Sequence, residues 1–378
     1  MIAVSGVGAL EGALTLRALI GARPRITMIT PDADFTSGAT AAGEAPAGTA
    51  RHAITRIAAD LALELRDDRV VSVQPSAHTL QTADGATVAY DRLLLALGTR
   101  RTAVFKDALT VDDDPLGSHL AGLRAEIKRR EVESIAFIAP RGTIWALALY
   151  ELALQTAAHA ADLSLGLSIS VATPEPAPLA AFGPEASAVV RRMLNRAGIS
   201  LATGARCQLH KPGKLVMEPG GAPLSVDRIV ALPLLRGPSI SGISSGPEGF
   251  VSVDSQSRVR GLGGIFAAGD MTHLPLKHGG LAAQQADLAA ETIVAERAGL
   301  PAPRPRTLIA EAILVGTDRS VRLRAELGDR GIATRCVVFE EPPGMPLDRL
   351  ITRRLTAYLH KLDRAATPRP GREVATAR

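Results

Sequence analysis

The sequence predicts an α/β protein with two three-layer domains, each built on a parallel sheet, and a small C-terminal domain. Three observations predict this fold. A strand–turn–helix–strand unit opens the chain, a second unit of the same design begins near residue 135, and a glycine-bounded strand at 262–270 precedes a long helix. Because a helix that joins two neighbouring strands of one sheet leaves them parallel, repeated units of this kind indicate parallel sheets.

The first unit begins at the N-terminus. Ile2–Val4 is short and apolar, as in a buried strand, and residues 5–8 (SGVG) are typical of a glycine turn. Apolar residues at helical spacing then cover Ala9–Ile20, and Arg25–Thr30 is a second strand that ends at Pro31-Asp32.

The second unit repeats the first. Ile135–Phe137 matches the opening strand, and the helix from Ala146 matches the helix from Ala13 without a gap. After ten inserted residues, a strand ending in Thr173-Pro174-Glu175 matches the strand ending in Thr30-Pro31-Asp32. Chance identity in Ala- and Leu-rich helices is the alternative explanation, and the matching Thr-Pro-acid ends argue against it. Two Rossmann-like units are therefore expected.

Short apolar segments between turn residues predict the remaining strands at 70–73, 79–81, 87–89, 92–97, 200–203, 215–217 and 228–232. Gly98 closes the strand at 92–97, and residues 301–306 (PAPRPR) indicate a stiff linker. The expected organisation is a first domain formed by 1–108 and 248–300, a second domain at 109–247, a C-terminal domain at 301–365 and a disordered tail at 366–378.

The composition favours a globular protein. Of 378 residues, 46% are hydrophobic and 21% charged, which argues against disorder. The net charge is +5, but there is no long basic run and aromatic residues make up 3%, so no nucleic-acid surface is expected. Cys207 and Cys336 lie far apart, which favours a reducing cytoplasm over a disulfide framework. We expect no signal peptide, since the N-terminus has no basic segment, and no membrane span, since no apolar run reaches about 18 residues.

The segment with the most specific chemistry lies near the end of the core. It reads LGGIFAAGD at 262–270 and continues with Lys277, Gly279-Gly280 and a helix at Leu281–Arg297. Glycine lets the backbone approach a phosphate chain, and an aspartate at the carboxyl end of a strand accepts hydrogen bonds from ribityl or sugar hydroxyls. The N-terminus of the helix offers free N–H groups and a positive dipole end to an electron-rich ring.

These residues resemble the second FAD motif of the pyridine nucleotide–disulfide oxidoreductase superfamily. The match lies in Phe266–Asp270, in the Lys-x-Gly-Gly that starts at Lys277 and in residues 282–286 (AAQQA). Tyr90–Gly98 is similar to the middle motif of the same superfamily, and the most similar branch holds the sulfide:quinone oxidoreductases and type II NADH dehydrogenases. The resemblance covers roughly residues 1–300 and implies FAD extended across the first domain, with its isoalloxazine at the second.

The resemblance also implies the roles of individual residues. Gly269 and Asp270 would hold the ribityl chain and phosphate, and Lys277 with the backbone of Gly279–Leu281 would face the flavin N1–C2=O edge. Lys277 is thereby the candidate catalytic group, acting through electrostatics. The full expected set of FAD-binding residues is Gly6, Gly8, Ala9, Asp32, Gly98, Gly269, Asp270, Lys277, Gly279, Gly280 and Leu281, and no metal site is expected.

The first glycine loop departs from the pattern Gly-x-Gly-x-x-Gly/Ala. Aligned on Leu10-Glu11, the loop has Val4 in place of the first glycine and Ala9 at the third position. Aligned on Gly6 and Gly8, it has Glu11 at the third position. Either alignment loses one glycine, although Ala is tolerated where the helix packs on the sheet.

The strand that should end in an acid for the adenosine ribose ends instead in Thr30. Asp32 and Asp34 are the candidates to replace that acid, unless both are ordinary loop residues. Residues 35–38 (FTSG) stand where the superfamily often has an aromatic residue followed by Arg-Pro, so a phosphate contact is expected to be lost.

The second dinucleotide loop, residues 139–145 (APRGTIW), retains one glycine. The backbone therefore cannot approach a pyrophosphate closely, and Pro140 lacks an N–H. NAD(P)H binding is disfavoured, with Arg141 for a phosphate and Glu175 for a ribose as the residues that would support it. Trp145 either shields the flavin or belongs to the core.

Thiol chemistry is also disfavoured. Sulfide oxidation needs two cysteines at the flavin face, whereas Cys207 and Cys336 form no Cys-x-x-Cys motif and suit a packing role. His273 and His278 flank Lys277 and lie either near the flavin or in a solvated loop.

Residues 346–363 predict an amphipathic helix with an apolar face and several arginines beside it. Such a helix either docks on an anionic membrane, or packs on its own protein or in a homodimer interface. The expected function is a cytoplasmic FAD-dependent oxidoreductase with two-electron chemistry and quinone as a candidate acceptor. The alternatives are a type II NAD(P)H dehydrogenase and a non-catalytic interaction protein that keeps the fold.

Overall fold

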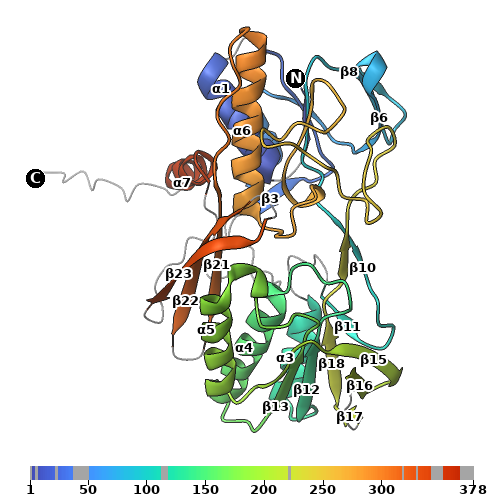
Figure 1. Cartoon of the computed structure of the whole chain (residues 1–378), viewed down its shortest axis with the longest axis vertical. Helices are drawn as coiled ribbons and strands as arrows, with labels where there is room; N and C mark the ends of the chain where they lie inside the picture. The colour runs from blue at the N-terminus through green and yellow to red at the C-terminus, as the bar shows by residue number, and fades with distance from the viewer. Residues whose placement is uncertain are drawn as a thin grey trace, which may run out of the picture.

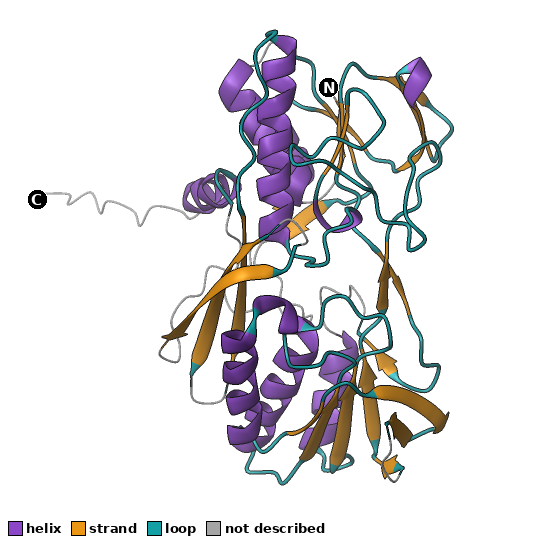
Figure 2. Cartoon of the chain, viewed as in Figure 1, coloured by secondary structure: helices purple, strands orange, loops and turns teal. Residues whose placement is uncertain are grey.

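This computed structural model describes residues 2–4, 7–21, 24–36, 51–111, 118–219, 223–316, 319–328, 331–341 and 352–366. Two α/β domains lie end to end, and a C-terminal antiparallel sheet packs beside them (Figure 1). Each α/β domain has its own parallel sheet, with long helices against it (Figure 2). The predicted α/β architecture is confirmed.

The first domain is built on a five-stranded parallel sheet with the order β20-β9-β1-β2-β5. Its strands are β20 (Ile265–Ala267), β9 (Leu93–Leu95), β1 (Ile2–Val4), β2 (Thr27–Ile29) and β5 (Glu64–Arg66). From β1 the chain order runs outward to β2 on one side and to β9 on the other. The switch point of the sheet, where such folds bind ligands, therefore lies between β1 and β9.

Two layers cover this sheet. Helices α1 (Val7–Ile20) and α6 (Gly279–Arg297) pack side by side on one face (Figure 1). The other face carries the antiparallel strands β6 (Val70–Gln74), β7 (Thr79–Thr82) and β8 (Thr87–Ala89). Alternate side chains of β9 pack on opposite faces of the sheet. Leu94 packs towards helices α1 and α6, whereas Leu93 and Leu95 pack towards the antiparallel strands β6, β7 and β8.

The second domain repeats this architecture. Its parallel sheet has the order β11 (Leu109–Thr110), β18 (Arg228–Ala231), β12 (Ser134–Ile138), β13 (Ser168–Ala172) and β14 (Ser200–Ala202). One face packs on α3 (Ser118–Lys128), α4 (Leu147–Asp162) and α5 (Pro184–Arg196). The other face packs on β15 (Arg206–Lys211), β16 (Lys214–Glu218) and β17 (Leu224–Ser225).

The internal repeat predicted from the sequence extends to individual hydrogen bonds. At the end of β2, the Thr30 hydroxyl accepts from the N–H of Asp32 and donates to its carboxylate, both at 3.1 Å. At the end of β13, the Thr173 hydroxyl makes the same two bonds with Glu175, at 3.2 and 3.4 Å. The Thr-Pro-acid sequence therefore specifies one local geometry in both domains, which argues against chance identity.

The domains are joined by two strands that cross between them, β10 (Arg100–Thr102) and β19 (Leu234–Arg236), which pair antiparallel. Smaller elements complete the first domain. The pair β3 (Asp34–Thr36) and β4 (Arg51–Ala53) leads into α2 (Ile54–Asp60). The 3-10 turns are η1 (Pro75–Ala77), η2 (Ala180–Phe182) and η3 (Gly269–Met271).

The C-terminal segment forms an antiparallel sheet that the sequence analysis did not anticipate. Its strands are β21 (Leu308–Val315), β22 (Ser320–Leu327) and β23 (Ala333–Glu341), in that order. One face of the sheet packs on the helices of the second domain, and β21 also contacts α6 of the first.

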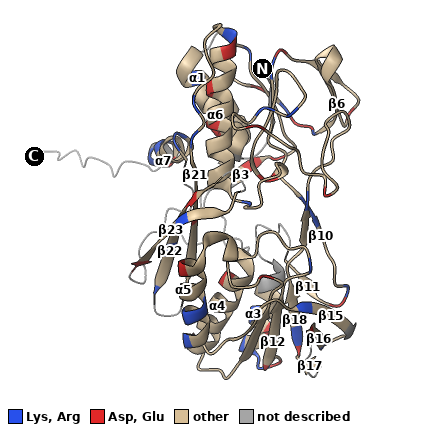
Figure 3. Cartoon of the chain, in the orientation of Figure 1, with Lys and Arg blue, Asp and Glu red and all other residues tan. Residues whose placement is uncertain are grey.

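Helix α7 (Leu355–Ala366) follows and packs on the first domain. The predicted apolar face is present in its described part, where Leu355, Leu359 and Leu362 are buried in the same core as α1 and α6. The two arginines just before it, Arg353 and Arg354, lie beside acidic residues of α6, and Arg353 contacts Asp287 at 3.1 Å (Figure 3). This packing follows the alternative in which the helix lies on its own protein, because a membrane would have to remove these leucines from the core. Residues 346–351 and the tail at 367–378 lie outside the described residues.

Helix α7 is also held at its N-terminus. The carboxylate of Glu11 in α1 accepts hydrogen bonds from the backbone N–H of Arg354 at 2.9 Å and of Leu355 at 2.8 Å. These two groups have no partner inside their own helix, so Glu11 satisfies them from another element. Burial raises the pKa of Glu11, and the two N–H groups oppose that shift. Glu11, which occupies the third glycine position when the first motif is aligned on Gly6 and Gly8, thus has a structural role.

Candidate functional site

The carboxyl edge of the first parallel sheet brings most of the predicted residues together. Asp32 follows β2, Gly98 follows β9, and Gly269-Asp270 follow β20. Because these strands are parallel neighbours, their carboxyl ends meet at one edge, next to the switch point. Gly6, which follows β1, lies outside the described residues.

Two glycines at this edge adopt a conformation that other residues avoid. Gly98 has φ +67° and Gly269 has φ +76°. A Cβ on Gly98 would meet nothing within 4 Å, so the backbone there is open to a neighbour. A Cβ on Gly269 would lie 2.7 Å from Cβ of Ala282, so Gly269 is needed where the strand turns against α6. The Gly269 N–H also donates to Oε1 of Gln285 at 2.7 Å.

The first glycine motif serves the contact between α1 and α6. A Cβ on Gly8 would lie 3.2 Å from the backbone oxygen of Ala282, and a Cβ on Gly12 would lie 2.7 Å from Cδ2 of Leu94. One turn further on, the Thr15 hydroxyl donates to buried Asp287 at 2.6 Å. Gly8 therefore packs against α6, and its expected role in cofactor binding stays a prediction. Ala9 beside it is fully buried.

The small-xxx-small spacing of Gly8 and Gly12 was the signal for this close approach, and the sequence analysis overlooked it. Neither Gly12 nor Thr15 was therefore expected to matter. Together these contacts fix α1 against α6.

Asp32 is exposed at the carboxyl end of β2, with one carboxylate oxygen held by Thr30. Thr30 itself is buried, so it cannot take the place of the missing ribose acid. Asp34 begins β3 instead of flanking the sheet edge. Of the two acids that the sequence offers, Asp32 is the one beside the edge where a ribose would lie.

Lys277 is buried, with 4% of its surface exposed, so it does not point to solvent. Its Nζ donates to the backbone oxygen of Thr272 at 2.7 Å and lies 4.0 Å from the centroid of the Phe250 ring. Burial lowers the pKa of Lys277 to about 8, and the charges of Asp270 and Glu248 oppose the shift. Among the described residues, no carboxylate lies within ion-pair distance of Nζ.

The N-terminus of α6 is less open than the sequence suggested. The helix begins at Gly279, where we expected Leu281, and His278 caps it. Nδ1 of His278 accepts from the Gly280 N–H at 3.1 Å, and its backbone oxygen accepts from the Leu281 N–H at 3.0 Å. The expectation of free N–H groups at Gly280 and Leu281 was therefore wrong, because the chain caps its own helix end. The Gly279 N–H has no acceptor among the described residues.

The two histidines of this segment, His273 and His278, each accept a hydrogen bond from a backbone N–H of the protein itself. Burial lowers the pKa of His278 to about 4, so the ring is neutral at pH 7 and suited to accept a hydrogen bond. Nδ1 of His273 accepts from the Val253 N–H at 3.4 Å, and burial lowers its pKa as well.

The corresponding loop of the second domain has a different geometry. Residues 140–143 form a turn in which Thr143 donates to the backbone oxygen of Pro140 through its N–H at 3.1 Å and its hydroxyl at 2.7 Å. In the repeat alignment Pro140 matches Val7, where α1 begins, yet α4 begins only at Leu147. The helix end that would face a pyrophosphate is thus displaced by about two turns.

The acid of the second domain is already engaged. Glu175 accepts from the hydroxyl of Tyr150 on α4 and from Thr173. Burial raises the pKa of Glu175, and these hydrogen bonds oppose that shift. Arg141 is exposed, and Trp145 packs on the core at 5.8 Å from the Phe182 ring centroid, as expected of a core residue.

The cysteines lie on different sheets. Cys207 is on β15, and burial raises its pKa to about 11. Cys336 is on β23, and burial also raises its pKa. Both are free thiols, and a raised pKa lowers the fraction of reactive thiolate. The described residues contain no cluster of His, Cys, Asp and Glu that would hold a metal ion.

No family profile and no curated protein sequence matches the chain significantly. Solved structures do match its fold. The sulfide:quinone oxidoreductase of Aquifex aeolicus superposes with a TM-score of 0.79 over 90% of this chain and 86% of its own, at 19% identity. A ferredoxin reductase of Rhodopseudomonas palustris gives 0.64 over 86% and 82%, at 19% identity. The water-forming NADH oxidase of Lactobacillus brevis gives 0.61 over 86% and 74%, at 14% identity. The chain therefore has the two-domain fold of these oxidoreductases.

Proposed function

We propose that this chain is an FAD-dependent oxidoreductase that carries out two-electron chemistry at the flavin. The observation that carries the proposal is the convergence of Gly98, Gly269-Asp270 and buried Lys277 around the edge next to the switch point of the first sheet. The likeness in fold to other oxidoreductases supports it.

Two features of the edge fit an FAD molecule. Gly98 leaves the space of a side chain open, so a phosphate or ribityl chain can pass close to the backbone. Lys277 is a buried cation with no carboxylate of the described residues within ion-pair distance, although the charges of Asp270 and Glu248 act on it from further away, and a buried charge without a close negative partner is unfavourable. An electron-rich ring edge beside it would supply that partner.

When bound, FAD supplies a ring that takes up and releases an electron pair. The residues of this chain would bind and orient it: Asp32 would hold the adenosine ribose, Gly269 and Asp270 would hold the ribityl phosphate, and Lys277 would provide positive potential at the N1–C2=O edge. Preorganised charge in a site that excludes water acts strongly on the reacting group. The Phe250 ring that covers Nζ excludes water from one side of Lys277.

We further propose a quinone as the electron acceptor and a small molecule as the donor. The fold similarity to the sulfide:quinone oxidoreductase over 90% of the chain supports the acceptor. NADH and NADPH are disfavoured as donors, because the 140–143 turn replaces the helix end and Glu175 is engaged with Tyr150. Sulfide is disfavoured because the two thiols lie on separate sheets with raised pKa values.

Stopped-flow absorbance tests this function. Protein reduced stoichiometrically with dithionite should be reoxidised by a soluble quinone much faster than by dissolved oxygen. Mixing the oxidised protein with NADH should bleach the flavin slowly or not at all. Fast, saturable bleaching by NADH would instead favour an NAD(P)H dehydrogenase that uses Arg141. A protein that cannot bind flavin would favour the non-catalytic alternative.

None of the helices in the described ranges is long and apolar enough to cross a membrane.

A further inference from the structure

The segment that leads into α6 and forms its first turns, residues 274–284, contains Lys277 and packs on the C-terminal sheet. Leu276 and Leu281 stand on either side of Lys277 and are almost fully buried, at 3% and 2% exposure. Both belong to the core that Ala310 of β21 also enters, and α6 contacts β21 directly. The segment that we expect at the flavin edge is therefore supported by the C-terminal sheet.

Gln284 joins this segment to the sheet through hydrogen bonds. Its amide group binds both backbone groups of Ile309 on β21: Oε1 accepts from the N–H at 2.9 Å, and Nε2 donates to the carbonyl oxygen at 2.8 Å. Nε2 also donates to the backbone oxygen of Gly280 at 3.0 Å. Because β21 is an edge strand of its sheet, Gln284 takes the place of a neighbouring strand at Ile309. One side chain therefore ties the sheet to the first turn of α6.

A second contact lies on the other side of Lys277 in the sequence. Gly331, which precedes β23, has φ +68°. A Cβ there would lie 2.6 Å from Cδ of Pro275 and 3.2 Å from Cδ2 of Leu274, so only glycine allows this close approach. The sheet thus contacts the segment at Pro275 and again at Gln284, with Lys277 between the two contacts.

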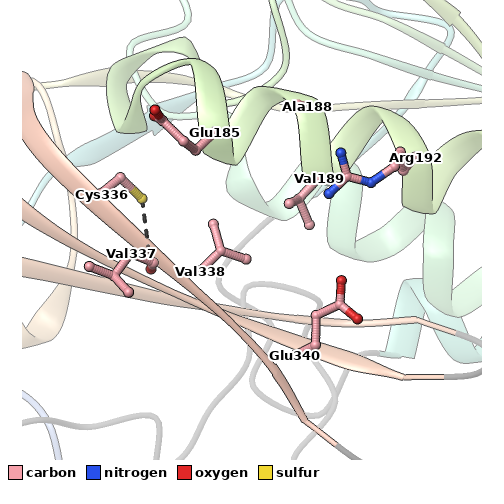
Figure 4. A pocket seen from close by; sticks show the side chains of 8 residues that line it. All are labelled: Glu185, Ala188, Val189, Arg192, Cys336, Val337, Val338 and Glu340. Atoms are coloured by element: carbon pink, nitrogen blue, oxygen red, sulfur yellow. Dashed lines mark hydrogen bonds between the residues drawn. The ribbon is translucent and has the colours of Figure 1, made fainter.

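The contact of the sheet with α5 of the second domain is less close. An open groove of about 520 Å³ lies between α5 and β23, lined by Val189 and Val338 and by charged side chains towards both ends (Figure 4). The middle of β23 is therefore loosely packed on α5. Close contact of the sheet with the first domain is found instead at β21 and at Gly331.

We propose that Gln284 and Gly331 are positioning residues of the flavin site, through which the C-terminal sheet holds Lys277 and the first turn of α6 against the N1–C2=O edge. This inference rests on the proposed FAD-dependent function. A cation stabilises developing negative charge most when its position is fixed before the reaction. Lys277 lies outside the regular part of α6, so its position depends on the contacts that hold the segment on either side of it.

Spectroelectrochemical titration of the FAD-loaded full-length chain tests the proposal. Gln284→Leu keeps the approximate size of the side chain and removes its three hydrogen bonds, whereas Gly331→Ala forces Pro275 away. Each substitution should weaken the binding of reduced FAD about ten-fold more than the binding of oxidised FAD, which lowers the midpoint potential of the two-electron couple by ~30 mV. A residue that only supported the fold would weaken both forms equally and leave the potential unchanged.

Two matched controls should leave the potential unchanged. Gln155→Leu replaces a half-buried glutamine of α4 whose Nε2 donates within its own helix, to Glu151 at 3.4 Å. Gly299→Ala introduces a side chain at φ +67°, close to the φ of Gly331, but its Cβ would meet nothing within 4 Å. Comparison of the two glycine variants therefore separates the contact with Pro275 from backbone strain.

Hydrogen–deuterium exchange of the FAD-free chain gives a readout that does not depend on the flavin. The amides of residues 278–284 and of Ile309 should exchange at least ~10-fold faster in Gln284→Leu than in the wild type, because the Ile309 N–H loses its acceptor and the first turn of α6 is released. The amides of β12, in the centre of the second sheet, should exchange as in the wild type, which checks that the variant is folded.

The possible outcomes separate this inference from the proposed function. An unchanged potential in both variants, with FAD bound and the fold intact, would overturn the proposal. Faster exchange at Ile309 without a change in potential would also overturn it, since Gln284 would then support only the fold. A wild-type chain that takes up no FAD would instead refute the proposed function on which the inference rests.

Discussion

Replacing Lys277 by methionine separates the electrostatic role of this residue from its packing. Methionine keeps the length of the side chain and its contact with the Phe250 ring, and it removes the positive charge. Lys277→Met should therefore leave the fold intact, and two quantities should change: the free energy of unfolding without FAD and the midpoint potential with FAD bound.

The first quantity follows from the pKa of Lys277, which burial lowers from 10.5 to about 8. The folded protein binds this proton less tightly than the unfolded chain does, by about 2.5 pKa units, which corresponds to ~3 kcal/mol. This cost is fully present below pH 8 and disappears as the pH rises from 8 to 10.5. At pH 7 the FAD-free variant should therefore be more stable than the wild type, by ~1–3 kcal/mol after the lost cation–π contact is subtracted.

The second quantity is the potential of the bound flavin. Reduction adds negative charge at the N1–C2=O edge, and loss of a preorganised cation there costs ~3 kcal/mol. For a two-electron couple, ~1.4 kcal/mol corresponds to ~30 mV, so the midpoint potential should fall by ~60 mV.

Urea unfolding of the FAD-free protein at pH 7 and pH 10 measures the first effect, and spectroelectrochemical titration of the loaded protein measures the second. Lys128→Met, at the exposed end of α3, is the matched control and should change neither. A midpoint potential that is unchanged in Lys277→Met would remove Lys277 from the flavin site. A variant with unchanged stability at pH 7 would show that the buried charge costs nothing.

Three further predictions concern other parts of the molecule. Gly269→Ala should destabilise the protein by ~2–4 kcal/mol in urea unfolding, because the new Cβ would lie 2.7 Å from Cβ of Ala282 at a positive φ. Gly263→Ala is the control and should be neutral, since a Cβ there meets nothing within 4 Å. Equal effects of the two substitutions would contradict this account. Glu11→Gln should expose residues 352–366 to limited proteolysis, since one N–H of Arg354 or Leu355 loses its acceptor; unchanged cleavage would refute the cap. Cys207→Ser and Cys336→Ser should leave flavin absorbance and turnover unchanged, and loss of turnover in either with FAD still bound would restore a thiol mechanism.

The sequence was sufficient to predict features that depend on local patterns. The strand, turn and helix of each repeat follow from apolar periodicity. The matching Thr-Pro-acid ends predicted a repeat, and the structure extends that repeat to the hydrogen bonds of Thr30 and Thr173. Glycines at the ends of β9 and β20 could be located because only glycine adopts a positive φ there without strain.

Features that depend on contacts between distant segments were missed. The cap that His278 places on α6, the burial of Lys277 under Phe250 and the engagement of Glu175 by Tyr150 each join residues whose proximity no local pattern reveals. Pairing of β10 with β19 is of the same kind.

The C-terminal sheet is a different case, because its signal was present. In β22 the apolar residues Val321, Leu323, Ala325 and Leu327 alternate with charged residues, and all four are buried. This period of two predicts a strand with one buried face. The sequence analysis assigned this segment to a C-terminal domain without recognising the strands.

The visible spectrum of the purified full-length protein tests the central claim most directly. The convergence of Gly98, Gly269-Asp270 and Lys277 predicts a yellow protein with flavin absorbance near stoichiometric with the chain, and release of FAD, not FMN, on denaturation. A colourless protein that does not take up added FAD would contradict the account.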